Sequence, residues 1–258
     1  MVFRWQVTPV YAADNSSQLM TRASVSVLIT RSQPGADEFA DLCRLRLRSE
    51  TPVVVSPIID IKLRAFAADL SQCDYLIATS GHAFSSLDDD ARTQGLVCYC
   101  VGDATAQRAA ELGFDAVSVS GNVHKLAEHL ISERPNGQGL YLRGREVAVD
   151  LLALLAKRAV LVDEVITYEQ AKMPLNQSAL DLLSGTGKVV SPIFSPRSAE
   201  IFSRFVVDAR AQLIPIAMSP NVARALSPEL GAPRIARAPN AEAVLHEIAD
   251  VLTADDTC

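Results

Sequence analysis

Short apolar runs alternate with amphipathic segments along the chain from Val25 onward. The apolar runs have the length of buried strands, and the segments between them have apolar residues at helical spacing. This alternation predicts parallel sheets that are covered by helices on both faces. Strands are expected at 25–30, at 53–61 with an interruption at Pro57, and at 75–79, 97–101, 116–119, 139–142, 160–169, 189–194, 213–218 and 234–236. Helices are expected at 34–48, 63–71, 83–94, 103–112, 123–133, 147–159, 178–183, 197–208, 220–226 and 241–252.

A weak internal repeat favours two similar domains over one large domain. The segment 101–109 is similar to the segment 218–226, and each copy is followed by a Leu-Gly pair. The offset is about 115 residues, which is the size of one small α/β domain. The opening strand and helix of the second copy lie far upstream, at 25–48, so the domain that contains this copy must be discontinuous.

The repeat predicts where the chain passes between the domains. The two crossings are extended and rich in β-forming residues, so we expect them to pair as a connector. Residues 1–24 are expected to be a disordered or over-long extension, with Met20 as an alternative initiator. We expect domain 1 at 25–51 plus 172–258, domain 2 at 62–161, and the β connector at 52–61 and 162–171.

Composition and charge narrow the classes of partner. The chain is 49% hydrophobic and 21% charged, which is typical of a globular protein. No apolar run approaches the roughly 18 residues of a membrane span. The net charge is −6, and no basic stripe indicates binding to nucleic acid. We therefore expect a cytoplasmic monomer that binds neither membranes nor nucleic acid.

The sequence contains no signature of a cofactor. The four histidines lack metal-ligand spacing, and the five cysteines include no Cys-x-x-Cys pair. Free thiols in a reducing cytoplasm are the simplest interpretation of these cysteines. The dinucleotide fingerprint and the phosphate-loop pattern are both absent. No metal, nucleotide or flavin is therefore implied.

Small polar residues mark four junctions between a strand and the following helix. Ligands of open parallel sheets bind outside the carboxyl ends of the strands. The first turn of a helix offers free N–H groups and a positive dipole end, which suit carboxylates. Ordinary helix capping is the alternative explanation for each junction alone, but the duplicated set favours a shared cleft. The candidate binding residues are Ser80, Gly81, His82, Gly102, Thr105, Ser195, Pro196, Ser198, Ser219 and Asn221.

Arginines at the same ends of the strands add positive charge. Arg31 follows the first strand, and Arg143 and Gly144 follow the strand at 139–142. The planar guanidinium matches the geometry of a carboxylate, although a solvated surface charge is the alternative for each arginine. We expect Arg31, Arg143 and Gly144 to bind substrate, with Arg197 at the rim of the cleft.

Several of these segments resemble the uroporphyrinogen-III synthase family. The run Val27–Arg31 is similar to the first strand of that family, 78–80 resembles its strand-end Thr-Ser, and 101–106 resembles its Gly-x-x-Thr-Ala turn. Tyr168 resembles the tyrosine that closes the connector strand, and Ser195-Pro196 and the helix at 241–252 also fit. The second copy departs from this pattern, because Val222 stands where the family often has a threonine.

The resemblance implies an α/β fold of two flavodoxin-like domains, each a parallel sheet with helices on both faces, joined by a two-stranded β connector. It implies a cofactor-free lyase that converts hydroxymethylbilane, a linear tetrapyrrole polycarboxylate, into uroporphyrinogen III with inversion of ring D and loss of water. Tyr168 would assist the loss of the hydroxyl, or would alternatively be a packing aromatic at the hinge. Thr105 would bind substrate or cap its own helix.

Two other functional classes stay open at this point. One is a non-catalytic anion-binding paralogue with the same architecture, which the departure at Val222 allows. The other is a signalling domain similar to response regulators. Such a domain would need several acidic residues at its strand ends, where this chain has serine and threonine.

Overall fold

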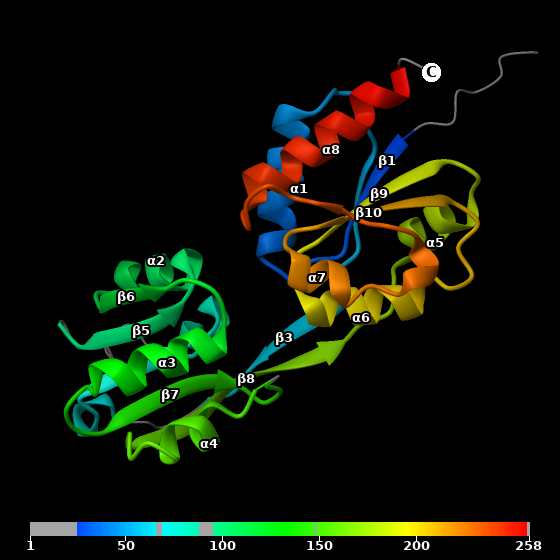
Figure 1. The fold of residues 1–258 in the computed structure, drawn as a ribbon. Helices are drawn as coiled ribbons and strands as arrows, with labels where there is room; N and C mark the ends of the chain where they lie inside the picture. The colour runs from blue at the N-terminus through cyan, green and yellow to red at the C-terminus, as the bar shows by residue number, and fades with distance from the viewer. Residues whose placement is uncertain (1–24, 66–68, 88–94, 148, 257–258) are drawn as a thin grey trace, which may run out of the picture.

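The chain forms two α/β domains that are joined by a pair of strands (Figure 1). The computed structural model describes residues 25–65, 69–87, 95–147 and 149–256. One sheet has five strands and the other has six. The predicted fold class, parallel sheets covered by helices in two domains, is confirmed. Within the described part of the chain, no helix is long and apolar enough to cross a membrane.

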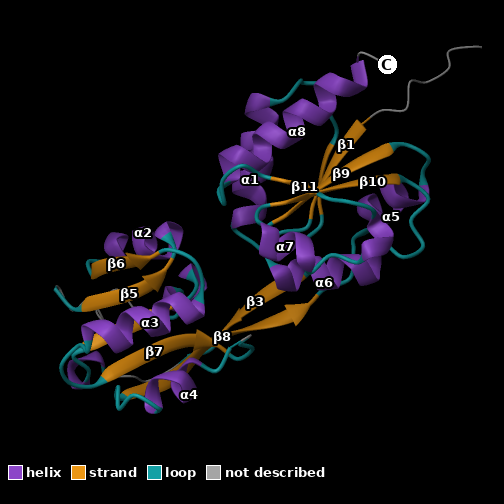
Figure 2. Ribbon diagram, viewed as in Figure 1, coloured by secondary structure: helices purple, strands orange, loops and turns teal. Residues whose placement is uncertain are grey.

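The sheet of the first domain combines strands from distant parts of the sequence, and all its described pairings are parallel. Its strands in spatial order are β11 (Arg234–Ile235), β10 (Gln212–Ala217), β9 (Lys188–Ile193), β1 (Val25–Ile29) and β2 (Val53–Val55). One face is covered by α1 (Gly35–Arg46) and α8 (Ala241–Asp256) (Figure 2). The other face is covered by α5 (Gln177–Ser184), α6 (Pro196–Phe205) and α7 (Pro220–Arg224).

The central strand β1 is apolar on both faces because helices cover both sides of the sheet. Val27 and Ile29 pack in the cluster under α1 and α8, whereas Leu28 packs in the opposite cluster. All three side chains are fully buried. Each such aliphatic side chain stabilises the fold by about 1.5–3 kcal/mol relative to exposure. This buried strand ends at Ile29, and Arg31 follows two residues later at its carboxyl end.

The second domain repeats this arrangement. Its strands in spatial order are β3 (Ile59–Leu63), β8 (Val162–Lys172), β7 (Gly139–Gly144), β4 (Tyr75–Ala78), β5 (Val97–Val101) and β6 (Asp115–Val119). One face packs against α3 (Val123–Glu133) and α4 (Leu151–Ala156). The other packs against α2 (Asp103–Glu111) and the 3-10 turns η1 (Leu70–Gln72) and η2 (Gly81–Phe84).

Strands β3 and β8 run between the domains and pair in antiparallel fashion (Figure 1). Their register extends from Ile59 opposite Lys172 to Leu63 opposite Tyr168. The earlier part of β8 pairs in parallel with β7 and so belongs to the second sheet. Strand β2 pairs with β1, which assigns the beginning of the predicted connector segment 52–61 to the first sheet. The residue boundaries of the two domains stay a prediction.

The interruption expected at Pro57 is confirmed, because the segment 53–61 forms the two strands β2 and β3, and Pro57 between them has no N–H to donate to a ladder. Two other local predictions need correction. In the described residues the helix expected at 63–71 is replaced at its start by the end of β3, where the Arg64 N–H donates to the Thr167 carbonyl at 2.8 Å, and at its end by the 3-10 turn η1. The helix expected at 83–94 is reduced to η2 in the described residues. The predicted extension at 1–24 lies outside the described residues.

Candidate active site

A cleft of about 550 Å³ lies between the two domains. Its walls are the turns that follow β1 in the first domain and β4 and β5 in the second, so it lies at the carboxyl ends of parallel strands. The first domain contributes Arg31, Pro34, Gly35 and Glu38. The second domain contributes Ser80, Gly81, His82, Ser85, Ala104, Thr105, Arg108 and Glu111.

Arg31 provides the cation of the first wall. Its guanidinium carbon lies 4.8 Å from the centre of the Phe194 ring, which is a cation–π contact. The guanidinium also lies directly against Gly35, where a Cβ atom would come within 2.6 Å of the Arg31 Nε. Burial lowers the pKa of Arg31, and the carboxylate of Glu38 opposes this effect. The ring and the glycine thus hold a partly desolvated positive charge at the cleft.

His82 and Ser80 form part of the opposite wall. The Ser80 Oγ accepts a hydrogen bond from the backbone N–H of His82 at 3.3 Å and thereby caps η2. Burial and the charge of Arg31 both lower the pKa of His82. We therefore expect a neutral imidazole at pH 7. The effect of Arg31 on His82 also shows that the two walls are electrostatically coupled.

Tyr168 lies on β8 behind this wall, and its side chain is buried. Its hydroxyl group lies near the side chain of Ser80, and its ring centre is 5.8 Å from that of His82. A Cβ atom on Gly144 would lie 2.8 Å from the ring, so the ring packs directly on that backbone. Burial raises the pKa of Tyr168, and the Ser80 side chain opposes the rise. The phenol is therefore a neutral O–H group at neutral pH.

The turn between β5 and α2 brings Thr105 to the cleft. Gly102 precedes the helix with a φ of +77°, a conformation that side chains rarely adopt. Thr105 lies in the first turn of α2, is buried, and lines the cleft. No side chain caps α2 at Gly102. The choice between substrate binding and capping for Thr105 stays a prediction.

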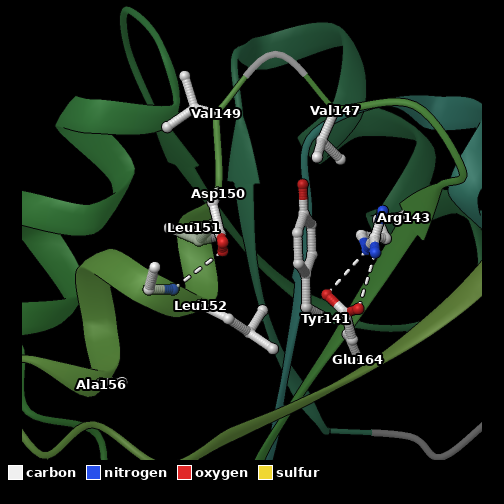
Figure 3. A pocket seen from close by; sticks show the side chains of 10 residues that line it. Tyr141, Arg143, Val147, Val149, Asp150, Leu151, Leu152, Ala156 and Glu164 are labelled. Carbon is white, nitrogen blue, oxygen red and sulfur yellow. Dashed lines mark hydrogen bonds and ion pairs between the residues drawn. The ribbon is translucent and has the colours of Figure 1, made fainter.

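Arg143 lies elsewhere. Its Nε and Nη2 atoms donate to the two carboxylate oxygens of Glu164 at 2.8 and 2.7 Å, and its Nη1 donates to the Gly144 and Arg145 carbonyls at 3.0 Å. It lines a separate pocket of about 470 Å³ within the second domain (Figure 3). The positive charge of Arg143 is thus neutralised by Glu164, and this arginine does not line the cleft between the domains.

The junctions of the first domain act as helix caps. The Ser195 Oγ accepts from the Ser198 N–H at 3.1 Å, and Pro196 occupies the first turn of α6. The Ser219 Oγ accepts from the Val222 N–H at 3.4 Å, and the side chain of Asn221 bonds with Arg224. Val222 is itself buried in the core. These residues follow β9 and β10, but they are not among the residues that line the described cleft.

Several charged residues that line the cleft are not predicted by any sequence motif. Arg108 donates to Glu111 at 3.1 Å, and Glu38 lies one turn into α1. Such residues have the spacing of an ordinary exposed helix surface, so no motif distinguishes them. Only the position of Arg108 in the sequence indicates that it lines the cleft. It lies one turn after Ala104 and Thr105, on a helix that starts at a predicted binding junction. Among the described residues, no group of three or more His, Cys, Asp or Glu could hold a metal ion.

The fold and the cleft define a two-domain α/β protein in which strand ends of both domains meet at one cleft. A family model described as uroporphyrinogen-III synthase HemD matches residues 37–246. The chain belongs to the uroporphyrinogen-III synthase family, which consists of lyases of haem biosynthesis.

Two solved structures share this fold. Uroporphyrinogen-III synthetase from Helicobacter pylori is 15% identical, with a TM-score of 0.60 over 88% of this chain and 99% of that one. A mutant uroporphyrinogen III synthase from the extremely thermophilic bacterium Thermus thermophilus is 15% identical, with a TM-score of 0.55 over 90% of this chain and 100% of that one. No curated protein matches the sequence. At this identity the likeness supports the architecture, whereas residue roles depend on the geometry of the cleft.

Proposed function

We propose that the cleft between the two domains folds hydroxymethylbilane and closes it into uroporphyrinogen III. One observation carries the proposal: turns at the carboxyl ends of strands from both domains line one space, with Arg31 on one wall and His82 on the other. A polycarboxylate chain requires several anion-binding groups that converge from different directions. Backbone N–H groups at helix starts and an arginine supply such groups.

The chemical problem is mainly one of geometry. The hydroxyl of the terminal carbon gains a proton and leaves as water, which breaks its bond to that carbon. The substituted carbon of ring D then forms a bond to the terminal carbon and gives a spiro intermediate. The original bond between ring D and its bridging carbon breaks, and the bridging carbon rejoins ring D at its unsubstituted α-carbon, which loses its proton, so that ring D is inverted as the macrocycle closes. Without a protein, the bilane closes without inversion and gives the type I isomer, so the cleft must favour one folded conformation.

Each wall has a role in this proposal. Arg31 binds a substrate carboxylate, because it is partly buried and its guanidinium is held by Phe194 and Gly35. Thr105 and the first turns of η2 and α2 bind further carboxylates through N–H and hydroxyl groups. Tyr168 donates a hydrogen bond or a proton to the departing hydroxyl. Its raised pKa keeps the phenol protonated, which favours the hydrogen bond, and makes the phenol a weaker acid. The proposal includes a cytoplasmic monomer that works without a metal or an organic cofactor.

The distribution of porphyrin isomers tests this function. Freshly prepared hydroxymethylbilane is incubated with the protein, and the products are oxidised and resolved into type I and type III. We expect strong enrichment of type III over the spontaneous type I product. A heat-denatured sample controls for the spontaneous reaction. An isomer ratio equal to that control would show that the chain is an anion-binding paralogue without this activity.

A further inference from the structure

An arginine with unused hydrogen-bonding capacity lies at the junction of the domains. Arg197, at the start of α6, donates from Nη2 to the Gln170 carbonyl at 3.4 Å, which is near the limit for a hydrogen bond. The same Nη2 is 3.9 Å from the carboxylate of Glu146. The Arg197 Nε is buried and has no partner in the described part of the chain. Arg143, in contrast, has bonds of 2.7 and 2.8 Å with Glu164.

Glu146 belongs to the other domain. It follows β7, and its second carboxylate oxygen accepts a hydrogen bond from the backbone N–H of Gln170 at 3.2 Å. The loose contact between Arg197 and Glu146 therefore joins α6 of the first domain to the end of β7 in the second. The two side chains retain 35% and 34% of their exposure, so a ligand from solvent can reach both.

Both charges lie close to Tyr168. Arg197 lowers the pKa of the phenol, whereas Glu146 raises it. Since the Tyr168 ring neighbours His82, which lines the cleft, the arginine stands next to the residue proposed to act on the departing hydroxyl. A substrate carboxylate beside that hydroxyl would come within reach of Arg197.

We propose that the carboxylate of Glu146 pairs with Arg197 in the substrate-free protein, and that a carboxylate of the bilane displaces Glu146 from Arg197 when substrate binds. The proposal rests on the proposed function, because it requires a polycarboxylate substrate. Two parallel N–H···O bonds from a guanidinium are much stronger than a contact at 3.9 Å. The exchange replaces one anion by another and transfers no proton. It makes Arg197 a specificity-determining residue and Glu146 its competitor.

Four proteins test the exchange: the wild type, Glu146→Gln, Arg197→Gln and the double variant. For each, KM, kcat and the isomer ratio are measured with hydroxymethylbilane, and the Kd for uroporphyrin III is measured by fluorescence. Removal of the competitor should lower KM and Kd about threefold, the scale of a partly exposed ion pair. Loss of Arg197 should raise both about tenfold or more, the scale of a charged hydrogen bond. The double variant should match Arg197→Gln.

The double variant separates exchange from simple repulsion. If Glu146 only repelled the substrate, its removal would lower KM even without Arg197, and that result would overturn the proposal. Unchanged KM and Kd in Glu146→Gln would overturn it as well. Arg197→Lys keeps the charge and should recover part of the affinity, and circular dichroism checks the fold of each variant. Arg204→Gln, on the same helix, and Glu133→Gln, on α3, are exposed controls that should match the wild type.

The assay also separates failure of this proposal from failure of the proposed function. If the wild-type protein forms no type III isomer, the proposed function is wrong, and the exchange then has no polycarboxylate substrate. If the wild-type protein forms type III but Glu146→Gln has unchanged affinity, only the proposed exchange is wrong.

Discussion

The buried phenol of Tyr168 is held by three neighbours of different kinds. The backbone of Gly144 supports its ring, the side chain of Ser80 lies near its hydroxyl, and the His82 ring lies beside it. A raised pKa keeps the hydroxyl protonated, and the packed ring keeps it in place. These two properties suit a hydrogen-bond donor to the departing hydroxyl.

The variant Tyr168→Phe tests this role. Loss of the hydroxyl should lower kcat about a hundredfold, in the range of general acid catalysis. Stability should fall by only about 1 kcal/mol, because the ring still packs on Gly144 and only the interaction of the hydroxyl with Ser80 is lost. Single-turnover assays and thermal unfolding provide the two readouts. The control is Tyr99→Phe on β5, which lies away from the cleft; a Tyr168→Phe enzyme with the kcat of the wild type would leave Tyr168 a packing residue.

Residue roles could be predicted only in part from the sequence. Arg31, Ser80, His82 and Thr105 line one cleft because each follows a parallel strand, and the carboxyl ends of parallel strands lie at the same edge of the sheet. Arg143 also lies at the carboxyl end of a strand, but its side chain pairs with Glu164 on the neighbouring strand β8. That pairing depends on the register of two strands and on the rotamer of the arginine, which a single sequence does not specify.

The turn from β5 into α2 is the element that most clearly requires a particular residue. At Gly102 the backbone has φ +77° and ψ 157°, a region that is almost restricted to glycine. Gly102→Ala should therefore destabilise the protein by about 1–3 kcal/mol and displace the first turn of α2 from the cleft. Urea unfolding and KM for the bilane measure the two effects.

The matched control is Gly81→Ala in η2, which has no positive φ and whose new Cβ would lie 3.8 Å from the nearest atom. Its free energy of unfolding should stay within about 0.5 kcal/mol of the wild type. Equal stabilities of the two alanine variants would show that the turn at Gly102 tolerates a side chain.

At the element scale, the long strands and amphipathic helices could be predicted because each follows one hydrophobic period. The expected helix at 178–183 is α5, and the expected strand at 189–194 is β9. The errors lie where tertiary pairing replaces local preference. Strand β3 forms because it pairs with β8, which lies about a hundred residues downstream. The local sequence near 63–71 does not predict this pairing.

In the whole molecule, residues of both domains line the cleft between them. The two domains are linked by β3 and β8 (Figure 1). Such a thin connection allows the domains to move as units. Binding of uroporphyrin III should therefore lower the radius of gyration in small-angle scattering, because carboxylates bridge both walls. An unchanged radius at saturating ligand would mean that the cleft is already closed without substrate.

The central claim is that the space between the domains controls which isomer forms, and a pair of tryptophan variants on α2 tests it most directly. Ala104 is exposed and lines the cleft, whereas Ala110 is exposed on the same helix but is not among the lining residues. With freshly prepared bilane, Ala104→Trp should yield mainly the spontaneous type I isomer, and Ala110→Trp should keep the type III share of the wild type. A wild-type share of type III from Ala104→Trp would place the reaction outside this cleft.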